Sequence, residues 1–205
     1  MPQGVRTKND GRRGQPGDPS LLALFGASGD LAKRKLFAAL VNLRRSNLLP
    51  NEFAVLGLAT SEMTSEAFRE RLGPELAGAA LPGQDPALVP WLLERTYYQP
   101  GDFRSPELFQ RLAEGLRDVD GRHGTRGNVI FYLATPPDFL GDMVDRLGAA
   151  GLTREEGGAF RRVIIEKPFG DSYESARALN ARLPTVLDER QIYRIDHYLG
   201  KETVQ

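Results

Sequence analysis

The chain has 205 residues, of which 40% are hydrophobic and 26% are charged, a balance typical of a globular protein with one sizeable core. Its 27 basic and 27 acidic residues cancel, so no overall basic field indicates nucleic acid as a partner. Cysteine is absent, which excludes disulfides, thiolate metal sites and a cysteine nucleophile, and fits a cytoplasmic location.

The first 19 residues are rich in glycine and in charged side chains, and we predict that they form a disordered arm. They lack the apolar core of a signal peptide. No apolar run approaches the roughly 20 residues that a membrane span requires. We therefore expect one domain over residues 20–205, with neither a signal peptide nor a membrane anchor.

In the first half of the chain, apolar runs alternate with helical spacings. Residues 21–25 are wholly apolar and predict a buried strand, and a helix follows from residue 31, where Leu36, Leu40 and Leu43 recur at helical spacing. Residues 53–59 predict a second strand and 64–72 a second helix. Residues 78–90 are rich in Gly, Pro and Ala and predict a loop, and Trp91 begins a core-facing helical turn.

The alternation continues in the second half. Strands are predicted at 97–99, 129–134, 163–165 and 191–195, and helices at 105–119, 136–147 and 172–187, the last with Ser172 as its N-cap. The polar residues 120–127, which include His123, predict a surface loop. Strands that alternate with helices indicate βαβ units and a parallel sheet. The predicted fold is α/β, a doubly wound, Rossmann-like and mostly parallel sheet with helices on both faces.

A glycine turn, Gly26-x-x-Gly29-x-x-Ala32, lies between the first strand and the first helix. Glycines allow a sharp turn and a close approach to a pyrophosphate, and the N–H groups at the helix start donate to phosphate oxygens. A plain tight turn would show the same spacing, but its place after the first strand favours a dinucleotide site. The basic residues 33–35 are interpreted as solvated surface.

The stretch 194–202, Arg-Ile-Asp-His-Tyr-Leu-Gly-Lys-Glu, follows the last predicted strand. If a helix begins near His197, then His197 and Lys201 lie on one face and offer two donors to a phosphate. Such a pair is more often solvated surface. The neighbouring Asp196 and the preceding strand favour a site, because ligands of α/β proteins bind at strand ends.

Two further residues lie near the carboxyl ends of predicted strands. Lys167 directly follows an apolar strand, and an ion pair with Glu166 is the structural alternative to a ligand contact. Tyr132 lies in an apolar strand, where a tyrosine more often belongs to the core with its hydroxyl hydrogen-bonded.

Three motifs in this order, at residues 26–32, 166–170 and 194–202, resemble those of glucose-6-phosphate dehydrogenases over residues 20 to 205. The resemblance implies hydride transfer from glucose 6-phosphate to NADP in the pentose phosphate pathway. It implies substrate contacts by Lys167, His197, Tyr198 and Lys201. The cofactor contacts that it implies are Gly26, Ala27, Ser28, Gly29, Asp30, Leu31, Thr60, Tyr132 and Lys167.

The resemblance also implies that Asp196 orients a catalytic histidine that lies beyond Gln205. Local chemistry leaves His197 open as the base, because a histidine beside an aspartate is a common acid–base pair. We therefore interpret the chain as an N-terminal, coenzyme-binding portion that lacks the base and a larger β-sheet domain and is inactive alone. We expect the full-length protein to be a homo-oligomer, and no metal is expected.

Thr60 stands where the family often has an arginine at the end of the second strand, the position that distinguishes a 2′-phosphate from a free ribose. Because threonine carries no charge, we predict NADP binding with reduced discrimination, and NAD as a possible second cofactor. Two alternatives stay open: a non-catalytic, nucleotide-binding Rossmann module, and a dehydrogenase of another sugar phosphate.

Overall fold

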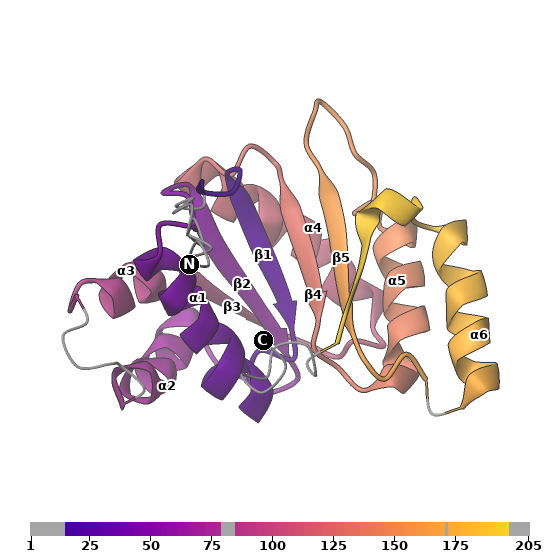
Figure 1. The fold of residues 1–205 in the computed structure, drawn as a ribbon, viewed down its shortest axis with the longest axis horizontal. Helices are drawn as coiled ribbons and strands as arrows, with labels where there is room; N and C mark the ends of the chain where they lie inside the picture. Colours follow the sequence, from indigo (N-terminus) through magenta and orange to yellow (C-terminus); the bar gives the residue numbers. More distant parts are fainter. Residues whose placement is uncertain (1–14, 79–84, 171, 197–205) are drawn as a thin grey trace, which may run out of the picture.

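The computed structural model describes residues 15–78, 85–170 and 172–196. Six parallel strands form one sheet in the order β3-β2-β1-β4-β5-β6, and their arrows point to the same edge (Figure 1). The strands are β1 (Ser20–Phe25), β2 (Phe53–Ala59), β3 (Thr96–Pro100), β4 (Val129–Leu133), β5 (Arg161–Glu166) and β6 (Ile192–Ile195). This order confirms the doubly wound α/β fold, because the chain moves outward from β1 to β3 and then returns to place β4 beside β1.

Helices pack on both faces of the sheet. On one face lie a π-helical turn (Ala32–Leu36), α1 (Phe37–Arg45), α2 (Ser65–Gly78) and α3 (Leu88–Glu94). On the other lie α4 (Pro106–His123), α5 (Leu140–Ala149) and α6 (Tyr173–Arg182). Short 3-10 turns occupy Pro137–Phe139, Leu183–Thr185 and Glu189–Gln191. None of the helices in the described ranges has the length and apolar character that a membrane crossing requires.

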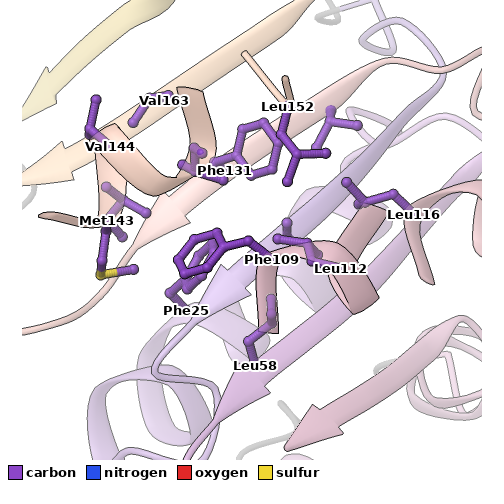
Figure 2. Close-up of a cluster of buried hydrophobic side chains, with 14 of the residues drawn as sticks. Phe25, Leu58, Phe109, Leu112, Leu116, Phe131, Met143, Val144, Leu152 and Val163 are labelled. Atoms are coloured by element: carbon purple, nitrogen blue, oxygen red, sulfur yellow. The ribbon is translucent and has the colours of Figure 1, made fainter. Parts of the chain in front are cut away.

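The core is divided into two clusters by the sheet. Alternate residues of β1 point to opposite faces, so that Phe25 packs toward α4 whereas Leu24 packs toward α1. Figure 2 shows the cluster on the α4 face of the sheet, in which Phe25 stacks on Phe109 with ring centroids 6.2 Å apart and lies near Phe131. Because both faces of the sheet are covered here, the strand sequence is apolar at every position from 21 to 25.

His123 belongs to α4 and not to a loop, so the prediction of a loop over 120–127 was wrong at its start. The helix continues through polar residues because they face solvent, and it ends at Gly124, whose φ of +65° allows its N–H to donate to the Asp120 carbonyl at 2.7 Å. The His123 Nε2 atom lies 2.9 Å from the Tyr97 hydroxyl, and burial lowers the pKa of this imidazole. The pair joins the end of α4 to the start of β3, and His123 is therefore a packing residue.

Other helix ends also differ from the predictions. The helix α2 continues past Leu72 to Gly78 with Pro74 inside it, and α3 begins at Leu88, within the predicted loop. Proline misled the prediction, because Pro90 lies in the first turn of α3, where a missing N–H costs little. The predicted helix 172–187 ends at residue 182, where a 3-10 turn follows.

The predicted cap of α6 is confirmed, because the Ser172 side chain accepts a hydrogen bond from the Ser175 N–H. Residues 1–14 of the expected arm lie outside the described residues, so the arm stays a prediction. At its end, the Gly17 N–H donates to the Leu48 carbonyl at 3.0 Å, and the Asn128 amide donates to the Pro19 carbonyl at 2.8 Å.

Candidate functional site

The glycine turn lies where the sheet order reverses. The Gly26 N–H donates to the carbonyl of Leu58 in β2 at 2.8 Å, and on the other side the Ala134 N–H donates to the Phe25 carbonyl at 3.2 Å. The Gly29 N–H closes the turn by donating to the Gly26 carbonyl at 2.9 Å. The turn therefore lies between the ends of β2 and β4, at the topological switch point where open α/β sheets bind their ligands.

Two glycines allow the chain to pack this tightly. Gly26 has a φ of +83°, and a Cβ atom added there would lie 2.3 Å from the Ala134 carbonyl oxygen. A Cβ atom added to Gly57 in β2 would lie 2.7 Å from the Ala27 Cβ atom. Sequence reasoning missed Gly57, although a glycine inside an apolar strand is a known signal of close backbone approach.

The helix that follows the glycine turn opens irregularly. Its backbone is helical from Asp30, and residues 32–36 form a π-helical turn in which the Phe37 N–H donates to the Ala32 carbonyl. An ordinary α-helix was predicted here, but single π turns are common at functional sites. A helix start at a glycine turn offers N–H donors and a positive dipole end, a donor set that fits a pyrophosphate.

The end of β2 forms the neighbouring part of the site. Thr60 and Ser61 are exposed there, and the Tyr98 hydroxyl of β3 donates to the Ser61 carbonyl at 2.7 Å. Burial raises the pKa of this phenol. Tyr98 thus connects β3 to the segment that follows β2.

Tyr132, the penultimate residue of β4, is largely buried and donates a hydrogen bond from its hydroxyl to the carboxylate of Glu166 in β5. Burial raises the pKa of the Tyr132 phenol, and the hydrogen bond and charge of Glu166 raise it further. The phenol is therefore a neutral donor near the carboxyl edge of the sheet. The alternative that paired Glu166 with Lys167 was wrong. Among the described residues, the Glu166 carboxylate accepts its hydrogen bond from Tyr132.

Lys167 pairs instead with Asp196, with 3.1 Å between Nζ and Oδ2. The backbone supports this geometry, because the Lys167 N–H donates to the Ile195 carbonyl at 3.1 Å and Glu166 lies opposite Ile195 in the β5–β6 register. The side chains are 56% and 31% exposed, and an exposed ion pair contributes at most about 1 kcal/mol to stability. The pair therefore contributes little to the stability of the fold. Its main effect is to hold two opposite charges at the end of the sheet.

The remaining predicted substrate contacts, His197, Tyr198 and Lys201, lie outside the described residues, and their roles stay predictions. In the sequence they come directly after Asp196, which follows β6.

Because all six strands are parallel, their carboxyl ends meet at one edge of the sheet (Figure 1). Gly26 follows β1, Thr60 follows β2, Lys167 follows β5 and Asp196 follows β6, while Tyr132 lies near the end of β4. The structure thus brings together, along one edge, five residues that are far apart in the sequence. A dinucleotide that crosses the switch point at Gly26 would extend along this edge.

A cavity of about 600 Å³ opens between α1 and the sheet face of β1, β4, β5 and β6, and it extends toward the amino ends of the strands, where Ser20 and Phe53 line it. Leu22, Leu40, Ile130 and Ile164 contribute to its apolar lining, and Tyr132 borders it. Ligand pockets combine apolar walls with a few convergent polar groups. The glycine turn and the Lys167–Asp196 pair supply such polar groups, so they form a better candidate site than this cavity.

The same region of the chain matches a known family. The family model described as "Glucose-6-phosphate dehydrogenase, NAD binding domain" matches residues 23–205. A glucose-6-phosphate 1-dehydrogenase of Treponema pallidum is 45% identical over 188 residues, which cover 91% of this chain and 36% of that protein. Glucose-6-phosphate 1-dehydrogenase 2 of Mycobacterium tuberculosis is 38% identical over an alignment 208 residues long, gaps included, which covers 98% of this chain and 39% of that protein.

Solved structures agree. A glucose-6-phosphate dehydrogenase in complex with its substrate glucose 6-phosphate superposes with a TM-score of 0.78 at 33% identity, covering 92% of this chain and 38% of that one. The glucose-6-phosphate 1-dehydrogenase of Mycobacterium avium gives a TM-score of 0.73 at 36% identity, covering 91% and 37%. The chain therefore spans well under half the length of these proteins. The chain belongs to the glucose-6-phosphate dehydrogenase family and corresponds to its NAD-binding domain.

Proposed function

We propose that this chain binds NADP across the glycine turn and presents Lys167 and Asp196 to a sugar phosphate. The protein of full family length that carries it then oxidises glucose 6-phosphate to 6-phosphogluconolactone. The observation that carries the proposal is the Lys167–Asp196 pair, 3.1 Å apart, at the same sheet edge as Gly26.

Some of these residues would bind the cofactor and others the sugar phosphate. A bound nicotinamide would supply the acceptor for the hydride that leaves C1 of the sugar. Residues 26–31 hold the pyrophosphate through backbone N–H groups. Lys167 lies beside both ligands, donates hydrogen bonds to sugar oxygens and helps to fix C1 against the ring. Asp196 accepts hydrogen bonds and orients a basic histidine contributed from beyond Gln205.

The phosphate of the sugar is held, in this proposal, by His197, Tyr198 and Lys201. Asp196 directly follows β6, and these three residues come within the next five positions of the sequence. Phosphate binding remote from the reacting carbon contributes positioning energy to catalysis.

Thr60 supports the choice of NADP with reduced discrimination against NAD. It is exposed directly after β2 and has no charge to offer a 2′-phosphate. We further propose a cytoplasmic protein that assembles as a homo-oligomer at full length; the lack of cysteine supports the first statement and the family resemblance the second.

The test is an enzyme assay on a protein of full family length that carries these 205 residues. We expect NADPH to form when glucose 6-phosphate and NADP are supplied, with kcat/KM for NADP less than a hundredfold above that for NAD. The 205-residue chain alone should bind NADP without turnover. Cofactor binding without turnover of any sugar phosphate in the longer protein would indicate a non-catalytic module. Faster turnover of a different sugar phosphate would assign another substrate.

A further inference from the structure

The end of β2 lacks a positive charge at the position that usually recognises a 2′-phosphate. Thr60 and Ser61 are neutral, and the exposed Glu62 that follows them is acidic. A phosphate dianion beside Glu62 needs a cation from another element, because like charges at short range oppose binding.

The helix α2 carries such a cation next to this segment. The Tyr98 hydroxyl donates to the Ser61 carbonyl at 2.7 Å, and the Tyr98 ring stacks on Phe68 of α2 with centroids 4.8 Å apart. Arg71 lies three residues after Phe68, so the two side chains are neighbours on the helix surface. Ser61 and Arg71 are therefore linked through one stacked pair of rings.

The start of α2 and the lean of its side chains determine where Arg71 can reach. The helix begins at Ser65, whose hydroxyl accepts a hydrogen bond from the Tyr98 N–H at 2.9 Å, so its N-terminus lies beside the middle of β3. Long side chains on a helix lean toward its N-terminus. Arg71 is exposed, and on this rule its side chain extends back along α2 in the direction of Ser65. Its charge acts on the Tyr98 phenol and opposes the effect of Glu62.

Arg69, the other arginine of α2, is already engaged. Arg69 donates to the Thr96 carbonyl at 3.2 Å and pairs with Glu66 at 2.8 Å. For Arg71, by contrast, no ion pair or hydrogen bond of the side chain occurs within the described part of the chain. Its guanidinium is therefore available to a ligand, and a guanidinium binds phosphate through two parallel hydrogen bonds.

We propose that Arg71 holds the 2′-phosphate of NADP and sets the preference of this protein for NADP over NAD. The inference rests on the proposed nucleotide function and deepens it. It replaces the missing charge at Thr60 by one from the next helix, and it explains how a chain without an arginine at the end of β2 can still favour NADP.

The experiment is a calorimetric titration of the 205-residue chain with NADP and with NAD separately. Arg71→Gln keeps a helix-forming side chain and removes the charge, and Arg71→Glu reverses it. We expect NADP affinity to fall about tenfold for Arg71→Gln and further for Arg71→Glu, with NAD affinity unchanged in both. The difference between the two cofactors should shrink as salt is added.

The same series includes two control variants and a check that each variant is folded. Arg45→Gln removes an exposed charge at the far end of α1 and should change neither affinity. Arg34→Gln tests the basic run after the glycine turn; loss of NADP preference there, with none at Arg71, would overturn the inference. Circular dichroism confirms that each variant is folded.

The outcomes separate this inference from the function beneath it. If both cofactors bind and the Arg71 variants keep the ratio of the parent chain, the Arg71 assignment is wrong while nucleotide binding stands. If the parent chain binds neither cofactor, the proposed function and the inference fail together.

Discussion

Replacement of Gly26 by alanine is expected to abolish cofactor binding and to destabilise the domain by about 3 kcal/mol. The added Cβ atom would lie 2.3 Å from the Ala134 carbonyl oxygen, a backbone atom that cannot move without shifting the end of β4. The φ of +83° adds roughly 1–2 kcal/mol of strain for a residue with a side chain, and forced overpacking adds about 1–3 kcal/mol. Urea denaturation and NADP titration measure the two effects.

Gly151→Ala is the matched control. Gly151 also has a positive φ, +70°, but a Cβ atom added there meets nothing within 4 Å. It should therefore show only the backbone strain, about 1 kcal/mol, and bind NADP normally. Equal losses of stability and unchanged NADP affinity in both variants would show that the close contact at Gly26 has no role in the site.

Replacement of Lys167 by alanine, in a protein of full family length, is expected to raise the KM for glucose 6-phosphate about a hundredfold. The change removes the ammonium that pairs with Asp196 at 3.1 Å and leaves the sugar without its donor, a loss of about 3 kcal/mol by the affinity scale. Stability should change by less than about 1 kcal/mol, because the ion pair is exposed. Steady-state kinetics at saturating NADP measure the KM.

Arg190→Ala provides the comparison for Lys167. Arg190 is exposed and forms ion pairs with Glu155 and Asp188, but it precedes β6 and lies at the opposite edge of the sheet. Its loss should leave KM unchanged. An unaltered KM in Lys167→Ala, or an equal rise in both variants, would remove Lys167 from the substrate site.

The central strands β1 and β2 could be predicted because every residue in them is buried. The run 53–59 coincides with β2, since every residue in it is buried and the apolar pattern ends where the strand ends. Helix ends were predicted less well. Pro90 and the polar end of α4 at His123 have the composition of loops, but helices tolerate proline in a first turn and polar residues on a solvent face.

Site residues could be predicted where a single local motif contains them. Contacts between residues on two different strands could not be predicted. The glycine turn and Lys167 follow their strands directly, so local sequence places them. The Tyr132–Glu166 hydrogen bond and the Lys167–Asp196 pair depend on the order β4-β5-β6 and its register, which no local pattern encodes. Arg71 went unnoticed for the same reason, because its link to Ser61 passes through a ring on β3.

The glycine turn and the Lys167 region are proposed to form one cofactor site at the carboxyl edge of the sheet. Amide chemical-shift mapping of the 205-residue chain during NADP titration tests it most directly. The largest changes are expected at residues 26–31, at Thr60 and at Lys167. Changes confined to the opposite edge, around Gly127 and Gly158, with Lys167 unaffected, would contradict it.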